Sequence, residues 1–130
     1  MYKINGNEYE CSVIASSDVI NDKWKIAIIW ILLSEEKRFK ELDEIITGIT
    51  QKTLTVKLKD LEEKNIINRE VFAEVPPRVV YSLTPAGQRL RPLFKEMYEW
   101  GISYVEEHGE ITEETVCCDT DISKKIGLTK

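Results

Sequence analysis

The stretch from Thr50 to Lys64 carries the side chains best suited to contacts outside the chain itself. Leu54, Leu58 and Leu61 recur at one-turn spacing, which predicts a one-faced helix that begins at an N-cap threonine, Thr50. At 100° per residue, the opposite face gathers lysine and hydroxyl side chains. Such groups donate hydrogen bonds to phosphate oxygens and base edges. This face suits a DNA major groove, and a solvated lysine-bearing surface is the alternative interpretation.

The candidate DNA-contacting residues lie on this helix and on the segments beside it. Those on the helix and at its start are Thr50, Gln51, Lys52, Thr53, Thr55, Val56 and Lys59. Lys40, Arg69 and Arg78 are candidates from outside the helix. Lys57 projects nearer the leucine stripe, so we expect its stem to pack against the domain.

The charge of the chain is unevenly distributed. The 130 residues predict one domain, and the net charge is -5, which argues against a general nucleic-acid binder. Residues 37–59, however, include six basic and three acidic residues, whereas residues 96–123 contain no lysine or arginine. Because phosphate contact acts over a Debye length of roughly 10 Å, a local basic surface is sufficient for DNA.

Several classes of protein are excluded by what the sequence lacks. The three cysteines fit no disulfide framework, and with His108 as the only histidine there is no zinc-type spacing. No apolar run reaches membrane-spanning length and the N-terminus is not a secretion signal, so we expect a cytoplasmic protein with no membrane contact. A thiol oxidoreductase using Cys11 or Cys117-Cys118 would lack a C-x-x-C motif and a partner histidine. We therefore expect no enzyme activity, metal or cofactor.

Two short helices joined by a turn are predicted in the first half of the chain. Residues 11–20 predict one or two helical turns, and Asp22 caps an almost wholly apolar helix that forms the centre of the core. A further helix over residues 38–46 is followed by the turn Thr47-Gly48-Ile49 and then by the helix after Thr50. This arrangement is typical of a helix-turn-helix.

A β-hairpin is predicted next, because residues 66–72 and 79–83 are rich in strand-forming side chains. Pro76-Pro77 stiffens the tip, so that Arg78 is expected to be held away from the body. A helix-turn-helix followed by such a hairpin is a winged helix. Thr84-Pro85 then starts a helix with a large apolar stripe, which predicts a dimer interface, and Pro92 is expected to kink it.

The predicted fold is mainly α with a small β-hairpin wing. It is a winged helix-turn-helix with N- and C-terminal dimerisation helices. Residues 1–21 form an N-terminal arm and short helix for dimerisation or sensing, and residues 22–85 form the DNA-binding domain. Residues 86–108 form the C-terminal dimerisation helix, and residues 109–130 form an acidic tail, either a short final helix or partly disordered.

The order of the motifs resembles the HxlR-type family of winged helix-turn-helix regulators, relatives of the MarR group, from about Cys11 to His108. The motifs are Cys11, Asp22-Lys23-Trp24, Arg38-Phe39-x-Glu41-Leu42, Gly48-Ile49-Thr50-Gln51-Lys52-x-Leu54, Glu74-Val75-Pro76-Pro77-Arg78-Val79-x-Tyr81-Ser82-Leu83-Thr84-Pro85 and Trp100-Gly101. The resemblance implies a homodimeric bacterial or archaeal transcription regulator that binds a pseudo-palindromic operator in double-stranded DNA. Val56 stands where a glutamine is common, and valine can contact only a thymine methyl group.

The resemblance also implies a switch at Cys11, since some members sense quinones, disulfide stress or formaldehyde near this position. A small electrophile or oxidant would then be the effector, and modification of Cys11 would change the dimer geometry. The position of Cys11 before a helix N-terminus favours the reactive thiolate, and a small buried hydrophobic residue is the alternative. A winged-helix protein-interaction module without DNA binding is the alternative function, and the net negative charge is compatible with it.

Overall fold

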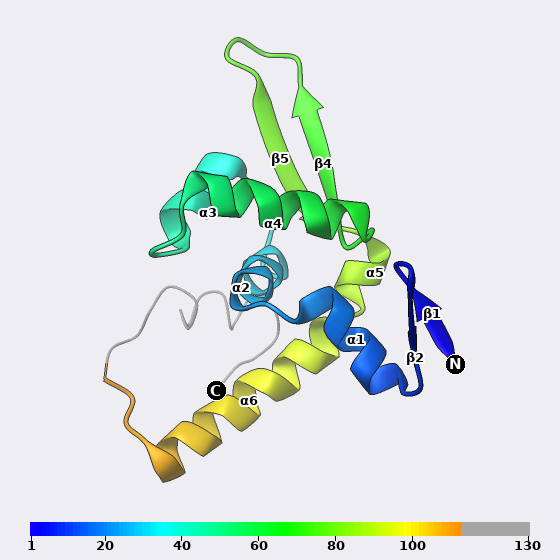
Figure 1. Cartoon of the computed structure of the whole chain (residues 1–130). Helices are drawn as coiled ribbons and strands as arrows, with labels where there is room; N and C mark the ends of the chain where they lie inside the picture. The colour runs from blue at the N-terminus through cyan, green and yellow to red at the C-terminus, as the bar shows by residue number, and fades with distance from the viewer. Residues whose placement is uncertain (113–130) are drawn as a thin grey trace.

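The computed structural model describes residues 1–112, in which a small antiparallel sheet extends from a body made mostly of helices (Figure 1). The helices are α1 (Ser12–Ile20), α2 (Lys23–Leu32), α3 (Phe39–Ile45), α4 (Gln51–Glu63), α5 (Pro85–Gln88) and α6 (Arg91–His108). The strands are β1 (Tyr2–Ile4), β2 (Asn7–Tyr9), β3 (Lys37–Arg38), β4 (Ile67–Phe72) and β5 (Arg78–Leu83). The predicted fold class, mainly α with a hairpin wing, is confirmed.

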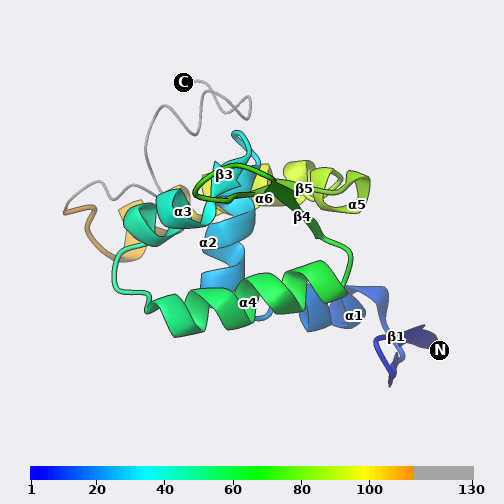
Figure 2. The same ribbon diagram turned by 90° about the horizontal axis from the view of Figure 1, so that it is seen from above.

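The core is built around α2, whose apolar residues point in nearly every direction. Ile28, Ile29 and Ile31 have no exposed surface, and Trp30 is also buried. Leu54, Leu58 and Leu61 of α4 belong to the same core cluster as these α2 residues. Figure 2 shows α4 crossing next to α2. Burying an aliphatic side chain of this size stabilises a protein by roughly 1.5–3 kcal/mol, so these contacts hold α4 on the body.

The ends of the main helices are set by the side chains expected from the sequence. The Asp22 carboxylate accepts a hydrogen bond of 2.7 Å from the Trp24 backbone N–H at the start of α2. The Thr50 hydroxyl accepts from the Thr53 backbone N–H at 3.1 Å at the start of α4. Thr84 caps α5 in the same way, with Pro85 in the first turn. Each cap satisfies a backbone donor that the helix leaves unpaired.

The wing is formed by β4 and β5, which pair from Ile67 opposite Leu83 to Phe72 opposite Arg78. A third strand, β3, was not predicted: Lys37 and Arg38 pair with Tyr81 and Val80 of β5. Two residues are too short for a periodic pattern, and only the neighbouring strand defines them as β structure. This pairing places the start of α3 beside the start of β5.

The prediction of one kinked C-terminal helix was wrong. The chain forms two helices, α5 and α6, and Pro92 lies in the first turn of α6, where its missing N–H leaves no hydrogen bond unmade. In Figure 1, α6 lies on the side of the molecule away from the wing. No helix among residues 1–112 is both long and apolar enough to cross a lipid bilayer. The predictions for Cys117, Cys118 and most of the acidic tail lie outside the described residues.

An N-terminal hairpin, β1 and β2, also was not predicted. Asn5 and Gly6 form its turn with φ angles of 49° and 80°, which glycine and asparagine adopt more readily than other residues. The hairpin packs on α1, because Asn5 and Tyr9 both donate hydrogen bonds of 2.9 Å to the Asp18 carboxylate. The expected N-terminal arm is therefore an ordered element.

Candidate nucleic-acid interface

The outer face of α4 is exposed and polar, as the sequence predicts. The exposed residues of α4 are Gln51, Lys52, Thr55, Val56 and Lys59, followed by the acidic Glu62 and Glu63 in its last turn. Leu54, Leu58 and Leu61 on the opposite face are at most 1% exposed. The helix is thus held from one side and free on the other, and the 54% exposed Val56 is accessible to a thymine methyl group.

All three candidate threonines make hydrogen bonds within the start of the helix. The Thr50 hydroxyl, besides capping the helix, donates to the Thr53 hydroxyl at 2.9 Å. The Thr55 hydroxyl donates to the Gln51 carbonyl one turn earlier at 2.8 Å. These hydroxyl oxygens keep acceptor capacity, but a base edge that needs a donor must compete with these internal bonds. Lys52 and Lys59 carry the cationic part of the face.

Ion pairs fix the inner side of α4 against α2. Lys57 pairs with Asp22, which confirms that Lys57 turns away from the outer face. The buried Lys25 of α2 pairs with Asp60 of α4, and Lys64 also contacts Asp60 at 3.0 Å. Burial alone would raise the pKa of Asp60, but hydrogen bonds and charge from Lys25 and Lys64 lower it. The carboxylate stays ionised, so α4 is bound to α2 by charge as well as by leucines.

Arg78 lies at the first position of β5, and its side chain is folded against the wing. Its guanidinium lies over the Phe72 ring, 4.2 Å from the ring centroid. Its Nη2 atom is 3.5 Å from Glu74 Oε1, a salt bridge within the wing tip. Arg69 and Lys40 are exposed, on β4 and α3.

The start of α3 lies beside the wing, where α3 contacts β3 and β5. A crevice of about 390 Å³ opens between α3 and the wing tip, lined by Arg38, Lys40 and the tip from Glu74 to Val79. Sequence reasoning missed Arg38, although its charge and its position beside Lys40 were visible. Figure 1 shows α4 crossing below the wing, with α6 on the other side of α4. These cationic residues therefore lie on the wing side of the molecule.

Cys11 occupies the N-cap position of α1 and is a partly exposed free thiol. The nearby backbone N–H groups of Ile14 and Val13 lower the pKa of this thiol, and partial burial acts in the opposite direction. The side chains of Val13 and Ile14 are themselves exposed, at 76% and 58%. Cys11 thus adjoins an apolar surface of α1.

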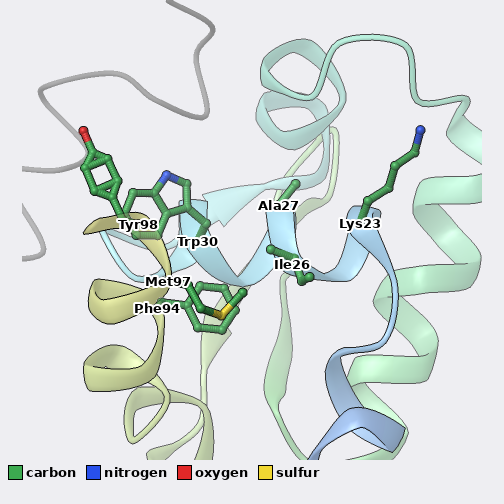
Figure 3. Close-up of a pocket in the computed structure, with 7 residues that line it drawn as sticks. All are labelled: Lys23, Ile26, Ala27, Trp30, Phe94, Met97 and Tyr98. Atoms are coloured by element: carbon green, nitrogen blue, oxygen red, sulfur yellow. The ribbon is translucent and has the colours of Figure 1, made fainter. Parts of the chain in front are cut away.

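A second apolar surface lies on α6. Trp100 is 66% and Tyr104 49% exposed, and their rings stack at 4.9 Å. Nearby, a hollow of about 330 Å³ lies between α2 and α6, where Figure 3 shows Trp30, Met97 and Tyr98 grouped together. Met97 also lines a neighbouring hollow beside Trp100. Apolar side chains therefore continue along α6 from the core to its exposed face.

Comparison with known proteins agrees with this geometry. The model of the HxlR-like helix-turn-helix family matches residues 19–109. The HTH-type transcriptional regulator YybR of Bacillus subtilis (strain 168) is 43% identical over 97 residues, which cover 75% of this chain and 78% of YybR. The redox regulator HypR in its oxidised form has 44% identity and a TM-score of 0.68, and covers 72% of this chain and 96% of HypR.

The regulator YodB of B. subtilis provides a third comparison. Its reduced form is 35% identical with a TM-score of 0.67, and the match covers 77% of this chain and 98% of YodB. The family match, the sequence identity and the winged fold agree with one another. The chain belongs to the HxlR-like helix-turn-helix family and is a transcriptional regulator of the HxlR type.

Proposed function

We propose that the protein is a homodimer that binds a pseudo-palindromic operator in double-stranded DNA. The observation that carries the proposal is the outer face of α4, where Lys52, Thr55, Val56 and Lys59 are exposed beside the wing. In the bound state, the α4 helices of two protomers enter successive major grooves about 34 Å apart, and the wings contact flanking phosphates. Its place of action is then the cytoplasm, where the DNA lies.

The exposed apolar residues of α6 and α1 support the dimer. Leu93, Met97, Trp100 and Tyr104 recur at helical spacing on α6, and each is at least 39% exposed. An isolated protein rarely leaves so much contiguous apolar surface in water. We propose that residues 1–21 and 86–108 make the dimer contacts and that residues 22–85 bind DNA.

Binding to DNA fragments from upstream of the gene, measured across a salt series, tests this function. Lys52→Ala should weaken binding roughly tenfold and reduce the slope of log affinity against log salt by one to two, because the dimer loses up to two phosphate contacts. Fluorescence anisotropy gives both quantities. Lys95→Ala, which removes an exposed lysine from α6, is the matched control and should leave the slope unchanged.

The alternative function, a winged-helix module that binds only proteins, predicts a different outcome. Its binding to DNA would show no preference for the upstream fragment over a random duplex. Lys52→Ala and Lys95→Ala would then have equal effects, because both change only the net charge. Equal slopes for these two variants would contradict the role of α4 in DNA binding.

We further propose that Cys11 senses an oxidant or electrophile. The relatives HypR and YodB support this, since HypR is described as a redox regulator and YodB has been crystallised in a diamide-treated form. In this chain the support is the partly exposed thiol at the start of α1, next to the apolar residues proposed for the dimer. Modification there adds bulk or charge at the interface, and dimer geometry controls the spacing of the α4 helices.

Alkylation of Cys11 should extend to lower pH in the folded protein than in the unfolded one. Backbone N–H groups stabilise the thiolate and lower its pKa, so the reactive form persists as the pH falls below the ordinary thiol pKa of about 8.5. Iodoacetamide labelling at several pH values, resolved by peptide mass spectrometry, gives the profile of Cys11 separately from the other two cysteines. A folded profile displaced to higher pH would argue against a sensing thiolate.

A further inference from the structure

The crevice between α3 and the wing tip brings together three cationic side chains, Arg38, Lys40 and Arg78. Pairing of β3 with β5 places Arg38 opposite Val80, so the first residues of α3 lie beside Arg78. Arg38 and Lys40 are exposed and line the crevice from one side. Glu74 is the only acidic side chain among the crevice-lining residues, against three cations.

Arg78 is held in place yet incompletely hydrogen-bonded. Stacking on Phe72 fixes its guanidinium plane, with 4.2 Å between the guanidinium carbon and the ring centroid. Its Nε atom is buried and has no hydrogen-bond partner among the described residues. The contact with Glu74 is long, at 3.5 Å, and the Glu74 side chain is 53% exposed. A guanidinium has five N–H donors in a fork that matches phosphate oxygens, so most of this capacity is unused.

We infer that this crevice holds one phosphodiester of the DNA backbone and that Glu74 occupies Arg78 in the absence of DNA. The inference rests on the proposed function, since DNA supplies the phosphate. The Glu74 carboxylate takes the place of the incoming anion, and it must leave Arg78 when a phosphate oxygen arrives. Arg38 and Lys40 then face the same phosphate from α3. Glu74 is thereby an internal competitor that weakens DNA binding.

Glu74→Gln is the variant that tests this competition. It removes the competing charge but keeps the size of the side chain, and it should tighten binding to a random-sequence duplex about threefold to fivefold at low salt, the range of an exposed ion pair. A random duplex is sufficient because every duplex presents phosphates. The matched control is Glu70→Gln, which changes the same charge on the same hairpin. Glu70 is exposed on β4 and does not line the crevice.

A double variant separates competition at Arg78 from a general change in charge. In an Arg78→Gln background, Glu74→Gln should improve binding by less than twofold, because the competitor no longer has a cation to occupy. The inference is overturned if Glu74→Gln and Glu70→Gln tighten binding equally, or if the gain persists without Arg78. It is also overturned if no variant binds the random duplex at low salt. Thermal unfolding of each variant confirms that it is folded.

The same assay distinguishes this inference from the proposed function. Preference for upstream over random DNA tests the reading of sequence by α4, whereas the Glu74 and Glu70 comparison tests the crevice. If the protein prefers upstream DNA but Glu74→Gln and Glu70→Gln have equal effects, the inference that the crevice binds a phosphate is overturned. The proposed function is then still supported. If Glu74→Gln tightens binding more than Glu70→Gln but the protein shows no preference for upstream DNA, the crevice inference is supported. The proposal of sequence-specific regulation is then contradicted.

Discussion

Replacing Trp100 with glutamate should prevent the proposed dimer from forming and leave a folded monomer of 15.1 kDa. Trp100 is 66% exposed on α6, so the fold of a single protomer depends little on it. In the proposed dimer it is buried, and a tryptophan buries roughly 150–250 Å². Placing a carboxylate there removes that apolar contact and leaves an unpaired charge in an apolar interface, which is strongly unfavourable.

Loss of the dimer should also lower the affinity for upstream DNA by roughly 100-fold or more, because the second α4 helix no longer benefits from a high effective concentration. Light scattering after gel filtration gives the mass, and anisotropy gives the affinity. Lys95→Gln is the control, since it makes the same change in net charge at an exposed position of α6 away from the Trp100 stripe. A Trp100→Glu protein that remained dimeric would contradict the assignment of α6 as the interface.

Gly87→Ala should destabilise the protein by about 2–3 kcal/mol, the usual cost of inserting a methyl group where there is no space. Gly87 lies in α5, and an added Cβ would lie far inside contact distance of the Ile66 backbone carbonyl oxygen. That oxygen cannot easily move. The Thr84 backbone N–H donates to it at 3.0 Å, and the Thr84 hydroxyl also contacts it, at 3.1 Å.

This contact packs α5 against the connection between α4 and β4, so Gly87→Ala should lower the melting temperature by roughly 5–10 °C. Scans must use equal protein concentrations, because the stability of a dimer depends on concentration. Gln88→Ala in the same short helix is the control, and as an exposed position it should change the free energy of unfolding by no more than about 0.5 kcal/mol. Equal melting temperatures for the two variants would show that the contact is not tight in solution.

The parts of the fold that were predicted correctly are those encoded by neighbouring residues. The start of α4 was predicted at Thr50 because an N-cap and a leucine repeat are both local signals. The wing was predicted because two runs of strand-forming residues flank a proline-containing tip. The exposed face of α4 followed from the same periodicity, since burial of one side determines which side remains free.

The parts that were missed depend on short elements or distant partners. In the N-terminal hairpin each strand has three residues, and Asn5-Gly6 was its one strong sequence signal. The orientation of Arg78 depends on Phe72, which lies across the hairpin, so the sequence suggested presentation where the structure shows stacking. The Lys25 and Asp60 pair joins residues 35 positions apart, and no local pattern indicates such a contact.

A hydroxyl-radical footprint of the protein on the upstream DNA that it binds tests the central claim most directly. The account predicts two protected segments on one face of the duplex, related by a pseudo-twofold axis and separated by about one helical turn or a multiple of it. Each segment comes from one α4 helix and its wing, and Trp100→Glu should abolish the paired pattern. Protection without any preferred position, or a single segment that Trp100→Glu leaves unchanged, would contradict a dimeric protein that reads DNA with α4.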